Sequence, residues 1–67
     1  MLSNAIEQVT GALSVTEFCT RYNVGRTFFY SEIKSGRLIA HKAGTKTLVL
    51  LSEADRWVRA LPKLGDE

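Results

Sequence analysis

Five side chains that can donate hydrogen bonds to a polyanion lie within one nine-residue stretch: Arg26, Thr27, Tyr30, Ser31 and Lys34. An arginine can donate two parallel hydrogen bonds to a guanine. Threonine and serine hydroxyls can contact bases or phosphates, and tyrosine and lysine suit the phosphate backbone. A solvated helix that binds nothing can carry the same residue types, so this set alone favours a nucleic-acid partner only modestly.

Two lysines, Lys42 and Lys46, flank a short segment that contains Gly44. Glycine adopts the positive φ of tight turns and allows the backbone to approach a ligand closely. We therefore expect both lysines at a hairpin tip that can reach a phosphate or a minor groove. The alternative is a charged hairpin whose lysines only keep an edge strand soluble.

The net charge of +2 is unevenly distributed along the 67 residues. Residues 18–51 contain six basic residues against one acidic residue, Glu32, whereas residues 1–17 carry a charge of −2 and residues 52–67 a charge of −1. A basic middle between acidic ends favours a polyanion that contacts the middle. A solvated basic face would show the same distribution.

The chain has none of the motifs that support catalysis or cofactor binding. It contains no Gly-x-Ser-x-Gly, no phosphate-binding loop and no dinucleotide fingerprint. One histidine and one cysteine cannot build a closed zinc site or an internal disulfide. We expect a protein that is not an enzyme and that has no metal and no cofactor.

No membrane partner is expected either, because the longest apolar run, residues 48–51, is far shorter than the roughly 20 residues of a membrane span. The single cysteine and the lack of a secretory leader favour a cytoplasmic protein. If the basic middle segment binds DNA, we expect the protein to be associated with the nucleoid of the cytoplasm.

Local signals predict two helices separated by a tight turn. Ser14 and Glu17 form a capping-box pair before an apolar stripe, which predicts a helix over residues 15–22. Residues 23–25 form the turn, with Asn23 suited to a left-handed conformation. A second helix is expected over residues 26–35, ended by Gly36. Two short helices joined in this way are typical of a helix-turn-helix.

After the second helix, the period of the apolar residues changes from the 3.6 of a helix to the 2 of a strand. Strands are expected over residues 38–42 and 47–51, with a loop over residues 43–46. A last helix is expected from Ser52, capped with Asp55 and ended by Pro62. Its inward stripe is Ala54, Trp57, Val58 and Leu61, with Trp57 as the core anchor. These elements predict an α+β winged helix-turn-helix over residues 14–62, preceded by an N-terminal arm (1–13) and followed by a C-terminal tail (63–67).

Five stretches in this order and spacing resemble the excisionase-type winged helix-turn-helix proteins, distant relatives of the MerR regulator DNA-binding domain. They are SVTEFC (14–19), VGRTFFY (24–30), IKSGRL (33–38), KAGTKTLV (42–49) and ADRW (54–57). The resemblance implies DNA contacts from Arg26, Thr27, Tyr30, Lys34, Lys42 and Lys46. Two positions depart from the pattern: Thr45 stands where a second basic residue is common, and Ser31 where a larger polar side chain is common.

The resemblance further implies an architectural protein that binds repeated sites on double-stranded DNA, bends the DNA and helps a site-specific integrase excise an integrated element. Cooperative self-association on repeated sites is expected because so small a monomer covers few base pairs. A small transcriptional regulator would use the same fold. A protein-interaction module that docks a host protein is the alternative from a different functional class.

Overall fold

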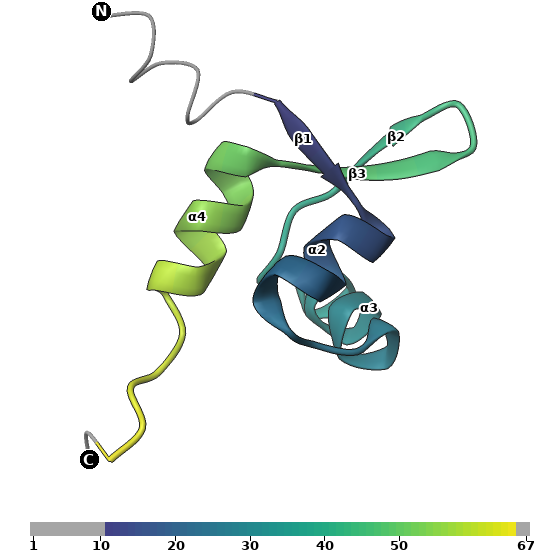
Figure 1. Cartoon of the computed structure of the whole chain (residues 1–67). Helices are drawn as coiled ribbons and strands as arrows, with labels where there is room; N and C mark the ends of the chain where they lie inside the picture. The colour runs from purple at the N-terminus through teal and green to yellow at the C-terminus, as the bar shows by residue number, and fades with distance from the viewer. Residues whose placement is uncertain (1–10, 66–67) are drawn as a thin grey trace, which may run out of the picture.

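The computed structural model describes residues 11–65. In chain order its elements are β1 (Ala12–Ser14), α2 (Val15–Tyr22), α3 (Arg26–Ser35), β2 (His41–Ala43), β3 (Lys46–Leu50) and α4 (Leu51–Arg59). The helices pack beside a small sheet, and the β2–β3 hairpin projects away from them (Figure 1). Within residues 11–65, three helices and a three-stranded antiparallel sheet make a small α+β fold, as expected, and this fold is compatible with a winged helix.

The helix-turn-helix has the predicted boundaries because its start and stop signals are local. Ser14 and Glu17 form the capping box: the Glu17 amide donates to Ser14 Oγ at 3.1 Å, and the Ser14 amide donates to Glu17 Oε1 at 2.9 Å. Asn23 ends α2 in the left-handed conformation, with φ 58°. Gly36 ends α3 in the same way, with φ 86°.

The sheet contains a strand that the sequence did not predict. β1 pairs antiparallel with β3, and β2 pairs with the other edge of β3, so the order is β1-β3-β2. Leu13 lies opposite Val49, and both side chains are buried. Ala12 and Leu13, which fall within the expected N-terminal arm over residues 1–13, thus form part of this sheet. Residues 1–10 lie outside the described part, as do residues 66–67 of the expected tail.

The hairpin is shifted from its predicted position. Ala43 and Lys46 pair with each other, so only Gly44 and Thr45 form the turn. Gly44 has φ 65°, the positive value that the first position of a II′ hairpin turn requires. The expected first strand began too early: Leu38 precedes β2 and instead fills the core at 2 % exposure.

The last helix begins and ends earlier than predicted. Leu50 is the residue before its first turn and makes no side-chain cap, so the expected Ser52–Asp55 box does not form. The Leu51 amide instead donates to the Gly11 carbonyl at 3.0 Å, which ties the start of α4 to the chain before β1. α4 ends at Arg59, ahead of Pro62, and Leu61 is exposed rather than inward.

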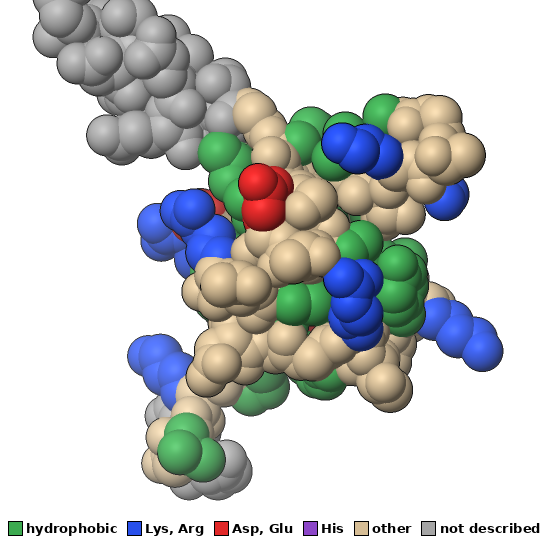
Figure 2. Space-filling view, turned by 45° about the vertical axis from the view of Figure 1, so that its right-hand side comes forward, with side chains coloured by type: hydrophobic (Ala, Val, Ile, Leu, Met, Phe, Trp, Pro, Cys, Tyr) green, Lys and Arg blue, Asp and Glu red, His purple; other side chains and the backbone are tan. Residues whose placement is uncertain are grey.

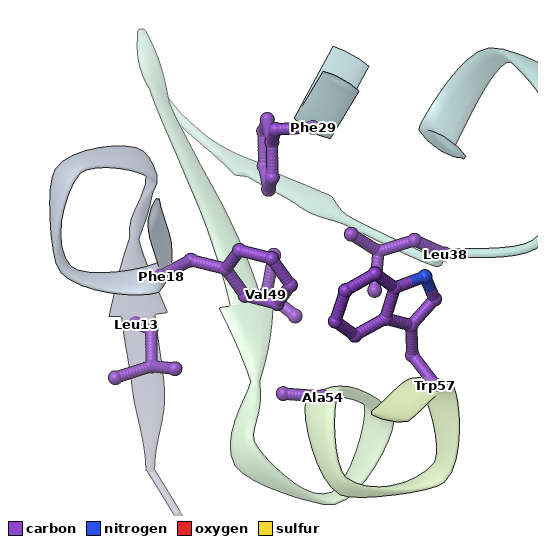
Figure 3. Close-up of a cluster of buried hydrophobic side chains, with 7 residues drawn as sticks. All are labelled: Leu13, Phe18, Phe29, Leu38, Val49, Ala54 and Trp57. Atoms are coloured by element: carbon purple, nitrogen blue, oxygen red, sulfur yellow. The ribbon is translucent and has the colours of Figure 1, made fainter. Parts of the chain in front are cut away.

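The core is a compact cluster between the helices and the sheet (Figure 3). Trp57 is 4 % exposed, which confirms it as the anchor contributed by α4. Its ring centroid lies 5.2 Å from that of Phe18, and Phe18 lies 5.1 Å from Phe29. The seven buried apolar residues are Leu13, Phe18, Phe29, Leu38, Val49, Ala54 and Trp57.

One buried charge, Glu32, also escaped prediction. Its carboxylate accepts from Trp57 Nε1 at 3.1 Å, from Arg37 Nε at 3.0 Å and from Arg37 Nη2 at 2.8 Å. Only 5 % of the Glu32 side chain is exposed, whereas Arg37 reaches solvent. The hydrogen bonds from Arg37, and then that from Trp57, hold the pKa of the Glu32 carboxyl below its usual value, against the opposing effect of burial.

Among residues 11–65, no helix has the length and apolar character needed to cross a membrane.

Replacing Trp57 with Ala should lower the free energy of unfolding by about 3–5 kcal/mol, the usual loss for a buried large aromatic side chain. A domain this small has little stability to spare, so the variant should be largely unfolded at room temperature. Circular dichroism during chemical denaturation measures the free energy of unfolding. Leu61→Ala, which shortens an exposed side chain beyond the end of α4, serves as the control. A native-like transition in the Trp57 variant would show that the core does not depend on this ring.

Acid should destabilise the fold through Glu32. A carboxyl group whose pKa is lowered by folding stabilises the native state above its unfolded pKa, about 4.3 for glutamate, and this contribution is lost as the pH falls through the folded value. Melting temperatures measured between pH 7 and pH 3 should therefore fall less steeply for Glu32→Gln and Arg37→Met than for the native chain. Lys34→Met removes a cation from the same helix without touching Glu32, so a flattened profile in that control would contradict the assignment.

Candidate nucleic-acid interface

The outward side of α3 carries all five of the residues singled out from the sequence. Phe29 and Glu32 are buried and Ile33 is half-buried, which defines the inward side of the helix. The other side is exposed along its whole length and carries Arg26, Thr27, Tyr30, Ser31 and Lys34. Because α3 spans ten residues, this side offers about three turns of polar and basic side chains to a ligand.

Arg26 is the first residue of α3 and is held by the preceding helix. Its Nη2 donates to Thr16 Oγ1 of α2 at 2.7 Å, although neither residue is buried. The sequence did not point to Thr16, because the two residues are ten positions apart and no local pattern relates them. Among residues 11–65, Arg26 forms no salt bridge.

Two of the hydroxyl-bearing residues are placed differently from each other. Ser31 turns back onto its own helix, where its hydroxyl donates to the Phe28 carbonyl at 2.7 Å, so it is free to accept a hydrogen bond but not to donate a second. Tyr30 is 48 % exposed and packs edge-on against Phe29. Tyr30 also lines a hollow of about 320 Å³ between α3 and the hairpin, together with Ile33, Ala40, His41, Lys42 and Thr47.

The hairpin register separates the two lysines that the sequence had placed together. Side chains alternate between the faces of a strand, and directly opposed residues share a face. Lys42 lies opposite Thr47, and Thr47 shares the face of buried Val49, so Lys42 is on the side that faces α3. Lys46 lies opposite Ala43 and therefore points to the reverse face. Both lysines are exposed, and Lys42 lines the hollow between α3 and the hairpin together with Tyr30.

Burial of Glu32 determines the charge of this surface. Glu32 is the only acidic residue between positions 18 and 51, and its buried carboxylate is paired with the solvent-exposed Arg37. In the view of Figure 2, Lys and Arg side chains lie over the part of the molecule that holds α3 and the hairpin, and others lie on the opposite flank. The remaining cations of the segment are all exposed: Arg21, Arg26, Lys34, Lys42 and Lys46.

The start of α3 adds to this positive potential. Its cap residue, Gly25, makes no side-chain hydrogen bond, and its first turn contains no acidic residue. α2 and α4 each carry a glutamate in the first turn, Glu17 and Glu53 respectively. An uncompensated helix N-terminus beside an arginine raises the local attraction for an anion.

A second hollow, of about 400 Å³, lies on the opposite flank of α3, against α4. Its apolar lining includes Phe28, which is 43 % exposed, and Leu61, which is 37 % exposed. Trp57 and the Glu32–Arg37 pair form its polar and aromatic floor.

In the described part of the chain, no cluster of three or more His, Cys, Asp or Glu side chains could hold a metal ion. Cys19, half-buried against the core, is a packing residue. Searches against family models, curated proteins and solved structures found no match to this chain. The likeness to excisionase-type proteins therefore stays an expectation from the residues.

Proposed function

We propose that this chain is a sequence-specific double-stranded DNA-binding protein that inserts α3 into the major groove. The observation that carries the proposal is the withdrawal of Glu32 from the surface, which leaves the exposed side of α3 and the adjoining hairpin with cations and no carboxylate. DNA presents one phosphate charge per roughly 1.7 Å of helix axis, so a surface of this kind complements it. No catalytic step is proposed.

The order of residues along α3 suits groove binding. The N-terminal residues of a recognition helix reach base edges, and later residues meet the flanking backbone. Arg26 and Thr27 stand at the start of α3 and are assigned to bases, with Arg26 suited to a guanine. Tyr30 and Lys34 are assigned to phosphates, and Ser31 offers an acceptor to a base or a bridging water.

The β2–β3 hairpin is proposed as the wing. Gly44 in its two-residue turn keeps the tip narrow, so the backbone can approach the duplex closely. Lys42 faces the same side as α3 and is assigned to a phosphate beside the occupied groove. Lys46, on the reverse face, is assigned a smaller contribution to phosphate binding.

The biological role proposed within this function is that of an excisionase-type architectural factor in the nucleoid of the cytoplasm. Cooperative self-association on repeated sites and an integrase beside it on DNA would complete that role. A small transcriptional regulator would use the same surface, because the two roles differ in the neighbouring protein rather than in the fold.

A protein-interaction module is a second candidate, and one observation favours it. The apolar hollow between α3 and α4 exposes Phe28 and Leu61, which a protein partner could cover. The two functions are separable by salt. Contacts to several phosphates give a steep fall of affinity with salt, whereas docking of a protein on an apolar hollow does not depend on phosphate neutralisation.

Lys42→Ala should lower the slope of log K against log salt for duplex DNA by about 0.9, because a phosphate that is no longer neutralised keeps its condensed counterion. Lys46→Ala is the matched control on the same hairpin and should change the slope by less than half as much. Both variants should melt close to the native temperature, since exposed charges contribute little to folding. Fluorescence anisotropy of a labelled duplex, titrated between about 50 and 200 mM salt, measures the slopes.

An unchanged slope in the folded Lys42 variant would show that Lys42 does not contact a phosphate, and unchanged slopes in both variants would show that the hairpin is not a wing. Equal changes of slope in the two variants would contradict the assignment of the lysines to different faces. If the native chain shows no salt-dependent binding to DNA, the proposed function fails and the protein-interaction candidate takes its place.

A further inference from the structure

The hydrogen bond between Thr16 and Arg26 joins the start of α2 to the start of α3. Thr16 is the second residue of α2, and Arg26 is the first residue of α3. Arg26 Nη2 donates to Thr16 Oγ1 at 2.7 Å. Neither side chain is buried, so packing does not force them together. The bond therefore fixes the direction of a long, otherwise mobile side chain on the surface assigned to DNA.

The partner of Arg26 differs in charge from the partners of the other bonded arginines. Within residues 11–65, Arg37, Arg56 and Arg59 each pair with a carboxylate, from Glu32, Glu53 and Asp55 respectively. A carboxylate orients an arginine but also neutralises it. Thr16 orients Arg26 through a neutral hydroxyl, so the guanidinium keeps its full charge for a ligand.

Within residues 11–65, the neighbouring acidic residue, Glu17, forms no ion pair with Arg26. Glu17 follows Thr16 directly, but its Oε1 accepts the Ser14 amide at 2.9 Å as part of the capping box. A guanidinium has five N–H donors, and the bond to Thr16 uses one of the two on Nη2. One complete two-donor edge therefore stays available, which is what bidentate recognition of a guanine requires.

We infer that Thr16 is a positioning residue that sets the guanidinium of Arg26 for base recognition. This inference rests on the proposed DNA-binding function and assigns a specificity role to a residue of α2 outside the recognition helix. An arginine side chain that already points in its DNA-bound direction loses less conformational freedom when DNA binds. The affinity for the base that this arginine recognises therefore rises relative to the affinity for other bases.

The test compares Thr16→Val, which keeps the shape and loses the hydroxyl, with Thr16→Ser, which keeps the hydroxyl. The probes are a duplex selected from a random-sequence pool by the native chain and a scrambled duplex of the same composition. Thr16→Val should lower the ratio of the two affinities by about 2- to 10-fold, the scale of one net hydrogen bond. Thr16→Ser should restore the ratio, and the salt slope should be unchanged because no phosphate contact is removed.

Thr20→Val is the matched control, one turn further along the same side of α2, and it should leave the ratio unchanged. A double-mutant cycle completes the test: in an Arg26→Ala background, Thr16→Val should have no further effect on the ratio. Melting temperatures identify any variant that fails to fold, and Thr16→Ser supplies the comparison in that event.

Three results would overturn the inference, and they differ from one another. An unchanged ratio in Thr16→Val would show that the bond does not serve recognition. Equally weakened binding of both duplexes would show that Thr16 supports a backbone contact that does not distinguish sequences. Independent effects of Thr16→Val and Arg26→Ala would show that the two residues act separately. Absence of salt-dependent DNA binding by the native chain would instead remove the proposed function itself, and the inference with it.

Discussion

The structure depends on one buried carboxylate. Glu32 joins α3 to Arg37 in the following segment and to the indole of Trp57 on α4. A buried charge is tolerated only when its hydrogen-bonding capacity is met, and removal of one partner leaves an expensive uncompensated group. The three groups must therefore stay together, which fixes α4 against α3. The same constraint removes the only negative charge from the surface between positions 18 and 51.

α3 thus serves the core and the surface at once. Phe29 packs in the aromatic cluster with Phe18, while residues on the other side of the same helix stay in solvent. A chain of 67 residues has few side chains to spare, so the residues on the exposed side of α3 are positioned by the same core that the helix helps to build.

Sequence patterns predicted the parts of the fold that local chemistry determines. The limits of α2 and α3 follow from Ser14, Glu17, Asn23 and Gly36, which act within a few residues of themselves. The missed features are non-local: β1 exists through its pairing with β3, and α4 starts where the Leu51 amide meets Gly11. The outward residues of α3 were predictable from helical period, but the Thr16–Arg26 bond and the separation of Lys42 from Lys46 require tertiary contacts and strand register.

The most direct test of the DNA-binding surface is a titration of the isotopically labelled chain with duplex DNA, followed by amide chemical shifts in NMR spectra. We predict that the largest changes fall at residues 26–34 of α3 and around Lys42, with small changes at the C-terminal end of α4. Changes centred on Trp57 and Leu61, with Arg26 and Lys42 unaffected, would contradict the claim and assign binding to the apolar hollow instead.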